Sequence, residues 1–492
     1  MSELASESSA PSAAVSGVVV LDGSVVPDRE EIGNKAHSLA TMHRLGMPVP
    51  PAFVLTTAVG RRCADGLPDD VWADVLAALA RLEAATGRRF GEELLVSVRS
   101  GAAHSMPGMM DTILNLGITD TVEAALAAAS GDAAFARDTH RRFRESYARV
   151  VGRAAPSDPH GQLRAAICTV FASWGSPRAV AYRNHQRMSH DGGTAVTVQA
   201  MVYGNLDDRS GTGVLFTRDP QSGDPTPMGE FLPRGQGEDV VSGEVDPLDL
   251  ADLAQRLPEV HAALLAAGRA LERHARDVQD VEFTVERGRL YLLQTRVAKR
   301  SARAALKLAA DFVDEAVLTP AEALARIRPD HVATVLRPVL DPEARATATV
   351  LARGEPACPG IGSGRAVADP DEAAFAGDDE DVVLVRHATS PEDVHGMIAA
   401  RAVCTEVGGR TSHAAVVSRE LGCPAVVGCG EGMLAAVEGR TVTVDGTAGE
   451  ILDGIVPVRT PEPSEVPALA RLVAWAKEHP DAVAADHPLV AL

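Results

Sequence analysis

The chain has 492 residues, a hydrophobic content of 46%, an aromatic content of 3% and a formal net charge of −20. This length predicts about two to four domains, whose cores must be filled largely by alanine and valine. The negative charge argues against nonspecific binding to nucleic acid or to an anionic membrane. No apolar run is long enough to span a bilayer. From the charge and from this pattern together, we expect neither a nucleic-acid partner nor a membrane partner.

The first segment, residues 1–16, is rich in Ser and Ala and lacks the basic-then-apolar order of a signal peptide. We expect it to be a disordered tail. The six cysteines form no Cys-x-x-Cys pair, and the histidines show no metal-ligand spacing on a plausible helix. These features indicate reduced thiols in a cytoplasmic protein without a zinc site.

The first candidate for phosphate chemistry is Lys35, in the segment Ile32–Met42. Gly33 precedes a helical pattern, so the lysine falls near a helix start, from which it can reach a phosphate. Taken alone, this segment favours a solvated surface lysine. A proline-rich stretch, residues 48–51, then leads into a strand.

A second candidate follows the buried-type strand Leu94–Val98, which delivers Arg99 into a loop of small residues. Gly108, Asp111 and Thr112 lie in and after this loop. A guanidinium at a strand end can bind a polyphosphate in a bidentate manner while loop N–H groups wrap the anion. The Walker sequence is absent, so this is not a P-loop.

Residues 121–190 are mostly helical by pattern and predict a small helical subdomain without catalytic chemistry. Residues 194–204 predict a core strand that contains Gln199 and Met201 and continues to Val202. For the last two residues, core packing is the simplest role.

Two further strands, residues 277–285 and 290–296, predict a hairpin around Arg287-Gly288. A strict two-residue turn would place Gln294 on the face opposite to Glu282. We predict a three-residue turn, Glu286 to Gly288, which brings Asp280 opposite Gln294 and puts Glu282 and Gln294 on one face. Oxygen ligands placed in this way suit Mg²⁺ bound to ATP phosphates.

The chain then leaves this domain through predicted helices at residues 299–315 and 320–327 and a linker at residues 337–342. Residues 356–456 predict a compact α/β domain. Residues 457–492 predict an Ala- and Pro-rich tail with one helix, residues 466–478.

The most informative stretch is Val407-Gly-Gly-Arg-Thr-Ser-His-Ala-Ala-Val-Val, which ends at Val417. Residues 403, 405 and 407 alternate as in a short strand, and Thr411 or Ser412 can cap the helix that follows. His413 then lies in the first helical turn, where free N–H groups and the helix dipole suit a phosphate. A histidine in this position can accept a phosphoryl group on a ring nitrogen.

This stretch resembles the phosphohistidine motif of the pyruvate, phosphate dikinase family, although the family usually has Met where this chain has Arg410. The strings Ser-Val-Arg-Ser-Gly-Ala and Ser-Met-Pro-Gly-Met-Met-Asp-Thr resemble the ATP-binding domain of the same family, which usually has Arg in place of Ala103. The resemblance extends from about Ile32 to Val456.

The resemblance implies an α/β (α+β) fold with an ATP-grasp-type domain at residues 17–300, a helical linker at residues 301–355 and a swivelling phosphohistidine domain at residues 356–456. It implies that ATP, with phosphate, phosphorylates His413 and yields AMP and pyrophosphate. Magnesium, the cofactor, would be bound by Glu282 and Gln294. The ATP-binding residues implied are Lys35, Arg99, Gly108, Asp111, Thr112, Gln199, Met201, Val202, Asp280, Glu282, Gln294 and Arg296.

In the family, a pyruvate-binding barrel follows the swivelling domain, and such a barrel needs at least ~200 residues. Only 36 residues follow Val456 here. We therefore expect onward transfer to pyruvate, or to another acceptor, to need a barrel subunit or acceptor protein in trans; a homodimer is compatible with this reading. The alternatives are a self-contained ATP-dependent phosphotransferase for a different small molecule and a non-catalytic nucleotide-binding regulatory module.

Overall fold

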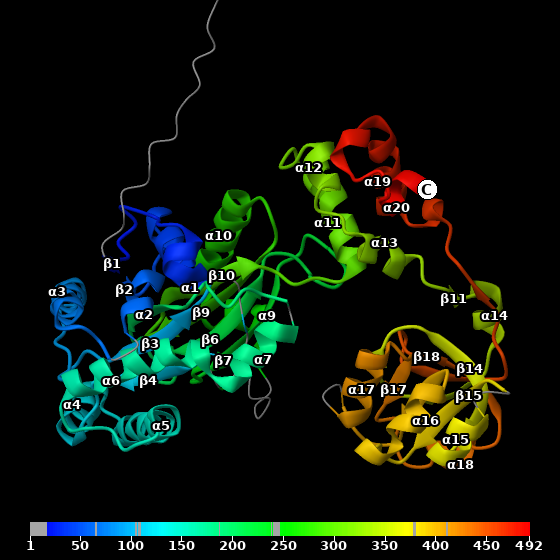
Figure 1. Cartoon of the computed structure of the whole chain (residues 1–492), viewed down its shortest axis with the longest axis horizontal. Helices are drawn as coiled ribbons and strands as arrows, with labels where there is room; N and C mark the ends of the chain where they lie inside the picture. The colour runs from blue at the N-terminus through cyan, green and yellow to red at the C-terminus, as the bar shows by residue number, and fades with distance from the viewer. Residues whose placement is uncertain are drawn as a thin grey trace, which may run out of the picture. The chain divides into compact units, whose positions relative to one another are not determined.

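The computed structural model describes residues 17–63, 66–103, 106, 110–185, 187–237, 239, 247–376, 380–409 and 412–492. The predicted tail at residues 1–16 lies outside this set. The chain divides into two compact units, residues 1–300 and 301–492, which are described separately below (Figure 1). Within the described residues, no helix is both long enough and apolar enough to cross a membrane.

Two five-stranded antiparallel sheets form the framework of the first unit, as Figure 1 shows in blue to green. Sheet 1 has the order β1-β2-β5-β3-β4, and sheet 2 has the order β10-β9-β6-β7-β8. The strands of sheet 1 are β1 (Val18–Val20), β2 (Ala52–Leu55), β5 (Ala195–Ala200), β3 (Val96–Gly101) and β4 (Thr112–Leu116). Those of sheet 2 are β10 (Arg289–Val297), β9 (Gln279–Glu286), β6 (Gly211–Phe216), β7 (Met228–Pro233) and β8 (Leu248–Asp249).

The helices of this unit pack their apolar sides into two cores. They are α1 (Arg29–Arg44), α2 (Thr57–Arg62), α3 (Asp69–Thr86), α4 (Asp120–Ser130), α5 (Ala133–Val151), α6 (Pro159–Ala172), α7 (Pro177–His185), α9 (Leu250–Arg256) and α10 (Pro258–Ala275). One core joins sheet 1 to α3 and α6. The other joins α1, α9 and α10 to both sheets. Helices α4 to α7 occupy most of residues 121–190, as the sequence pattern predicts.

The second unit contains a mixed eight-stranded sheet of order β12-β19-β18-β14-β15-β16-β17-β13. Its strands are β12 (Val350–Arg353), β19 (Glu450–Asp453), β18 (Thr441–Asp445), β14 (Ile361–Val367), β15 (Val382–Arg386), β16 (Ala402–Thr405), β17 (Ala425–Val427) and β13 (Glu355–Cys358). Around them lie α14 (Pro342–Thr347), α15 (Pro370–Ala376), α16 (Val394–Ala399), α17 (His413–Leu421) and α18 (Met433–Val437).

Strand β16, which leads to the histidine, is buried along its whole length rather than on alternate residues. It pairs in parallel with both β15 and β17, and parallel strands of this kind are covered on both faces. The expected alternation through residue 407 is therefore wrong, because the strand ends at Thr405 and Val407 is 40% exposed.

The remainder of the second unit is a cluster of short helices from two distant stretches of sequence. Helices α11 (Ala302–Asp314), α12 (Pro320–Leu324) and α13 (Pro329–Val335) meet α19 (Pro467–Glu478) and α20 (Pro488–Ala491). Leu469 and Leu472 of α19 are buried, and Arg471 pairs with Asp314 of α11. The segment at residues 337–342, expected to be a linker, contains β11 (Val339–Leu340), which pairs with β20 (Val458–Arg459).

Candidate functional site

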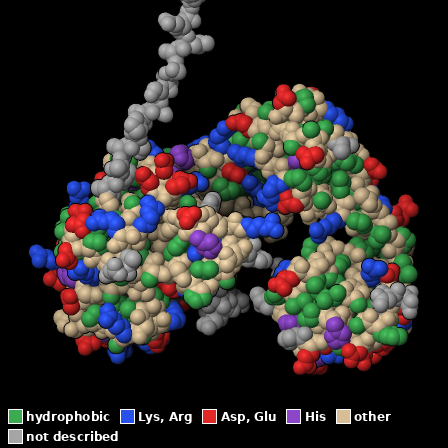
Figure 2. Space-filling view, in the orientation of Figure 1, with side chains coloured by type: hydrophobic (Ala, Val, Ile, Leu, Met, Phe, Trp, Pro, Cys, Tyr) green, Lys and Arg blue, Asp and Glu red, His purple; other side chains and the backbone are tan. Residues whose placement is uncertain are grey.

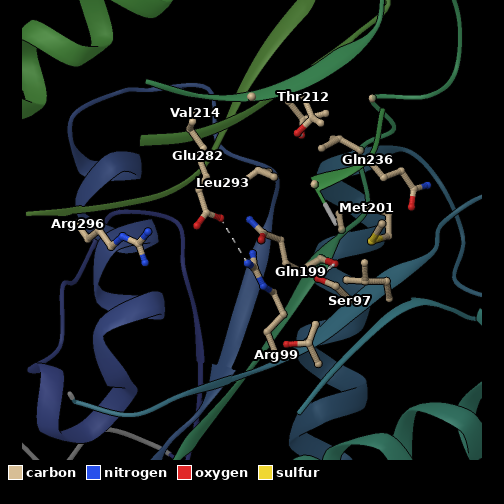
Figure 3. Close-up of a pocket in the computed structure, with 18 residues that line it drawn as sticks. Ser97, Arg99, Gln199, Met201, Thr212, Val214, Gln236, Glu282, Leu293 and Arg296 are labelled. Carbon is tan, nitrogen blue, oxygen red and sulfur yellow. Dashed lines mark hydrogen bonds and ion pairs between the residues drawn. The ribbon is translucent and has the colours of Figure 1, made fainter. Parts of the chain in front are cut away.

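A cavity of about 390 Å³ lies between the two sheets of the first unit (Figure 3). Strands β3, β4 and β5 supply one wall, and β6, β9 and β10 supply the other. A volume of this size lies within the range of cofactor and small-ligand sites. The wall from sheet 1 includes Ser97, Arg99, Thr112, Leu114 and Gln199, and the wall from sheet 2 includes Thr212, Val214, Glu282, Thr284, Leu293 and Arg296.

Three cationic side chains, Lys35, Arg99 and Arg296, gather beside this cavity with two carboxylates, Glu282 and Asp280. Arg99 Nη2 lies 3.9 Å from Glu282 Oε2, and Figure 3 shows Arg296 on the other side of Glu282. Burial lowers the pKa of Arg99, and the charge of Glu282 partly offsets that effect. Burial first, and then the neighbouring charge of Arg99, lowers the pKa of Lys35 to about 7. An excess of cationic groups in a partly desolvated site favours a polyanion.

Lys35 reaches this position because helix α1 begins irregularly. Gly33 has φ 74° and ψ 160°, which interrupts the helical geometry two residues before the lysine. A Cβ atom at Gly33 would lie 2.1 Å from the carbonyl oxygen of Gly101, so only glycine permits this approach. The Asn34 N–H donates to Ala102 O at 2.9 Å, which ties the helix start to the end of β3.

The β9–β10 hairpin corrects our prediction of its turn. Arg289 pairs with Glu286, so the turn has two residues, Arg287 and Gly288, both with positive φ. That is the geometry of the tight hairpin turn whose twist matches the strands. The predicted three-residue turn and the predicted pairing of Asp280 with Gln294 are both wrong.

A β-bulge between Leu292 and Gln294 changes the register, and Gln294 then pairs with Glu282. Directly paired residues of an antiparallel ladder point to the same face, so these two side chains are neighbours despite the shorter turn. A carboxylate and an amide oxygen are suitable Mg²⁺ ligands, which phosphates and water can complete. The described residues contain no cluster of three or more His, Cys, Asp or Glu side chains that could hold a metal by themselves.

Seven of the expected ATP-binding residues line the cavity. They are Arg99, Thr112, Gln199, Met201, Val202, Glu282 and Arg296. Strand β5 ends at Ala200, so Met201 and Val202 lie where the chain leaves sheet 1. The Gln199 amide donates to Pro50 O at 3.2 Å.

The other expected ATP-binding residues stand outside the lining. Asp280 is 6% exposed and accepts hydrogen bonds from Arg296, with both N–O distances at 2.7 Å. Asp111 pairs with Arg178 of α7. Lys35 and Gln294 are half-buried beside the site, and Gly108 falls outside the described residues.

Sequence reasoning did not assign several residues of the cavity wall, among them Ser97, Thr212, Thr284, Leu293 and Gln236. Thr284 lies on the same face of β9 as Glu282 by period two, and this signal was available. Leu293 reaches the cavity only because of the bulge, for which the sequence offers no signal.

The second candidate element lies in the eight-stranded sheet. His413 is the first residue of α17, and the Ser412 hydroxyl accepts the Ala415 N–H at 3.4 Å as the N-cap. Gly408, with φ 111°, turns the chain between β16 and the helix. Of the two expected caps, Thr411 and Ser412, the structure has Ser412 as the N-cap. Arg410 and Thr411 lie outside the described residues.

The neighbours of His413 orient its ring. Thr389 Oγ1 lies 3.0 Å from His413 Nδ1. The preceding loop is fixed by Glu406, whose carboxylate accepts the Gly432 N–H at 2.8 Å and contacts His387 Nδ1 at 2.9 Å. The hydrogen bond from His387, together with backbone N–H groups, lowers the pKa of Glu406. His413 is thus a half-buried histidine with one ring nitrogen engaged by a hydroxyl.

Comparison with known proteins finds a match for the unit that carries the cavity and another for the unit that carries His413. A family model described as the AMP/ATP-binding domain of pyruvate phosphate dikinase matches residues 63–260. A second, described as the mobile domain of PEP-utilising enzymes, matches residues 378–449. The first range includes Arg99 and Gln199, and the second includes His413. A nucleotide-binding domain followed by a mobile domain defines the class of PEP-utilising enzymes.

Within this class, the chain belongs to the pyruvate, phosphate dikinase family. The pyruvate, phosphate dikinase of Rhizobium meliloti is 40% identical over 531 residues, which cover 91% of this chain and 58% of the relative. That of Clostridium symbiosum is 38% identical, with 91% and 59% covered, and dikinase 2 of Zea mays is 38% identical, with 88% and 56% covered. The predicted family and α/β fold class are confirmed, and the chain spans somewhat more than half the length of these relatives.

Proposed function

We propose that this protein is a dikinase-type phosphotransferase that uses ATP and inorganic phosphate to phosphorylate His413. The observation that carries the proposal is the set of cations, Lys35, Arg99 and Arg296, around Glu282 beside a cavity of nucleotide size. The names of the relatives support the same chemistry. The acidic surface does not oppose it, because acidic and basic side chains are interspersed on the visible face of the first unit (Figure 2).

In this proposal, ATP occupies the cavity with its base toward Met201 and Val202 and its phosphates toward the cations. Glu282 and Gln294 would hold Mg²⁺, which neutralises phosphate charge and orients the reacting group when it is bound. Asp280 holds the guanidinium of Arg296 through two contacts of 2.7 Å. These residues bind and orient the phosphates, which is the main task of a protein in phosphoryl transfer.

The reaction would form a bond from His413 Nε2 to the β-phosphorus of ATP and break the bond between the α- and β-phosphates. AMP leaves, and the γ-phosphoryl group passes to inorganic phosphate as pyrophosphate. Nε2 can attack only when the ring proton is on Nδ1, and Nδ1–H can donate to Thr389 Oγ1 across 3.0 Å. Thr389 would thus select the reactive tautomer. The phosphoryl group on His413 would lie at the N-terminus of α17.

The acceptor belongs to the same proposal. The relatives are named for pyruvate, and we infer that pyruvate or another acceptor receives the phosphoryl group from His413. We propose that a partner chain, such as a barrel subunit or an acceptor protein, supplies the acceptor site. A cytoplasmic location would provide ATP and phosphate.

The test is incubation with Mg²⁺ and β-³²P-ATP, with and without phosphate. We expect acid-labile, base-stable label on the protein and release of AMP. His413→Ala should abolish the label, whereas His395→Ala should retain it, because His395 is an exposed histidine of the same unit paired with Asp371. Tight ATP binding without label under any condition would instead indicate a non-catalytic nucleotide-binding module.

A further inference from the structure

Helix α1 touches both walls of the nucleotide cavity. Its apolar side, including Ile32, Leu39 and Met42, belongs to a core that contains Val54 of sheet 1 and Phe283 of sheet 2. The turn that follows the irregularity at Gly33 is tied to sheet 1 through the Asn34–Ala102 hydrogen bond at the end of β3. The helix therefore bridges the wall that carries Arg99 and the wall that carries Arg296.

One turn after Lys35, a hydrogen bond ties the same helix to sheet 2. Ser38 Oγ accepts the backbone N–H of Thr295 at 3.0 Å. Thr295 lies on β10 between Gln294 and Arg296, so this contact is at the centre of the segment expected to bind metal and phosphate. Both residues are buried, with Ser38 6% exposed and Thr295 9% exposed.

The contact supplies an acceptor for a backbone N–H of strand β10. This strand is at the edge of sheet 2, so its outward N–H groups have no strand partner. One of them, Leu292 N–H, donates to Pro48 O at 2.8 Å. Thr295 N–H is buried and needs an acceptor, which Ser38 supplies. The Thr295 hydroxyl is engaged separately, by Gln279 Oε1 at 3.0 Å.

We propose that Ser38 is a positioning residue that sets the distance of Lys35 on α1 from Gln294 and Arg296 on β10. The Ser38–Thr295 hydrogen bond fixes the helix to the strand in one register, just beyond the bulge that brings Gln294 opposite Glu282. This inference rests on the proposed function, since it concerns how the β- and γ-phosphates of ATP are held. The base and the α-phosphate depend on it less.

The experiment compares Ser38→Ala with Ser210→Ala in the full chain. Ser210 is a matched control: it is 1% exposed, and its hydroxyl accepts the Arg287 N–H at 2.9 Å at the turn end of the same hairpin. Affinities for MgATP and for AMP are measured by calorimetry well below the unfolding temperature. We expect Ser38→Ala to weaken MgATP binding about tenfold, because the helix that carries Lys35 is no longer held to β10 in one register, and to leave AMP binding unchanged.

A purely structural role would not separate the two nucleotides. Equal losses of MgATP and AMP affinity in Ser38→Ala, or the same ATP-specific loss in Ser210→Ala, would overturn the inference. Ser38→Thr, which keeps the acceptor, should restore MgATP binding. Ser38→Cys, with similar size and a weak acceptor, provides the comparison if the alanine variant does not fold. If the wild-type protein binds no ATP, the proposed function itself is wrong.

Discussion

The low pKa of Lys35 makes a specific prediction about nucleotide binding. In the free protein this half-buried lysine has a pKa of about 7, because it is partly desolvated and lies beside the charge of Arg99. Bound triphosphate would raise the pKa again, since a nearby anion favours the ammonium form. Below pH 7 the lysine is charged in both the free and the ATP-bound protein, so ATP binding takes up no proton at this residue. Above pH 7, ATP binding must take up a proton, so affinity falls as pH rises.

The size of the effect follows from this pKa. For a free pKa of about 7 and a much higher bound pKa, affinity should fall about eightfold between pH 7.5 and pH 8.5. At pH 8, binding should take up about 0.9 proton. The phosphate of the nucleotide, with a second pKa near 6, is already ionised in this range and does not contribute.

The assay is calorimetric titration with MgATP in buffers of different ionisation enthalpy, which yields the number of protons exchanged. Lys35→Arg should bind MgATP without the pH slope, because the guanidinium stays charged. Lys35→Met should bind more weakly at pH 7 by about 10- to 100-fold, again without the slope. A flat affinity with no proton uptake in the wild type, or a slope that persists in Lys35→Met, would refute this account of the site.

Four further outcomes are expected. Gly33→Ala should lower stability well beyond Gly46→Ala in thermal unfolding, because Gly46 shares the positive φ but has open space where Gly33 meets a carbonyl. Thr389→Val should slow labelling of the histidine about 10- to 100-fold, the usual cost of removing an orienting partner, with MgATP affinity unchanged; an unaltered rate would argue against tautomer selection. Glu282→Gln should raise the Mg²⁺ concentration needed for half-maximal labelling, and an unchanged requirement would remove it from the metal site. Leu472→Ala should cost about 2–5 kcal/mol of unfolding free energy in a denaturant titration, because it leaves a cavity in the helical cluster; a loss well below 1 kcal/mol would mean that α19 packs only loosely.

Some features of the site are specified by a short stretch of sequence, whereas others depend on the fold. The cap, the first-turn histidine and the C-terminal Gly422 of α17 are encoded within about ten consecutive residues, and the structure has the expected helix. The Arg99 strand and the glycine before Lys35 are similarly local. Which of these residues share a cavity is a different matter, because Lys35, Arg99 and Arg296 come from three distant segments.

The β9–β10 hairpin combines features that the sequence predicts with a register that only the fold decides. The sequence indicated two strands and an Arg-Gly turn, and it correctly placed Glu282 and Gln294 on one face. The predicted cause of this placement was wrong, because the hairpin has a two-residue turn and a bulge in place of the three-residue turn. A bulge depends on packing against neighbouring elements, and period-two patterns carry no sign of it.

The sequence by itself determined the family, the α/β class and the histidine element, because each depends on short strings with local backbone requirements. Tertiary structure alone decided the register of the hairpin and the contact of Ser38 with the edge of β10. It also joined α11–α13 to α19 in one cluster, although the sequence treats these segments as a linker and a separate tail. In each case the deciding energy is the burial of apolar surface and the satisfaction of buried N–H groups between segments far apart in the chain. Such pairings have no local pattern, so only the folded chain selects them.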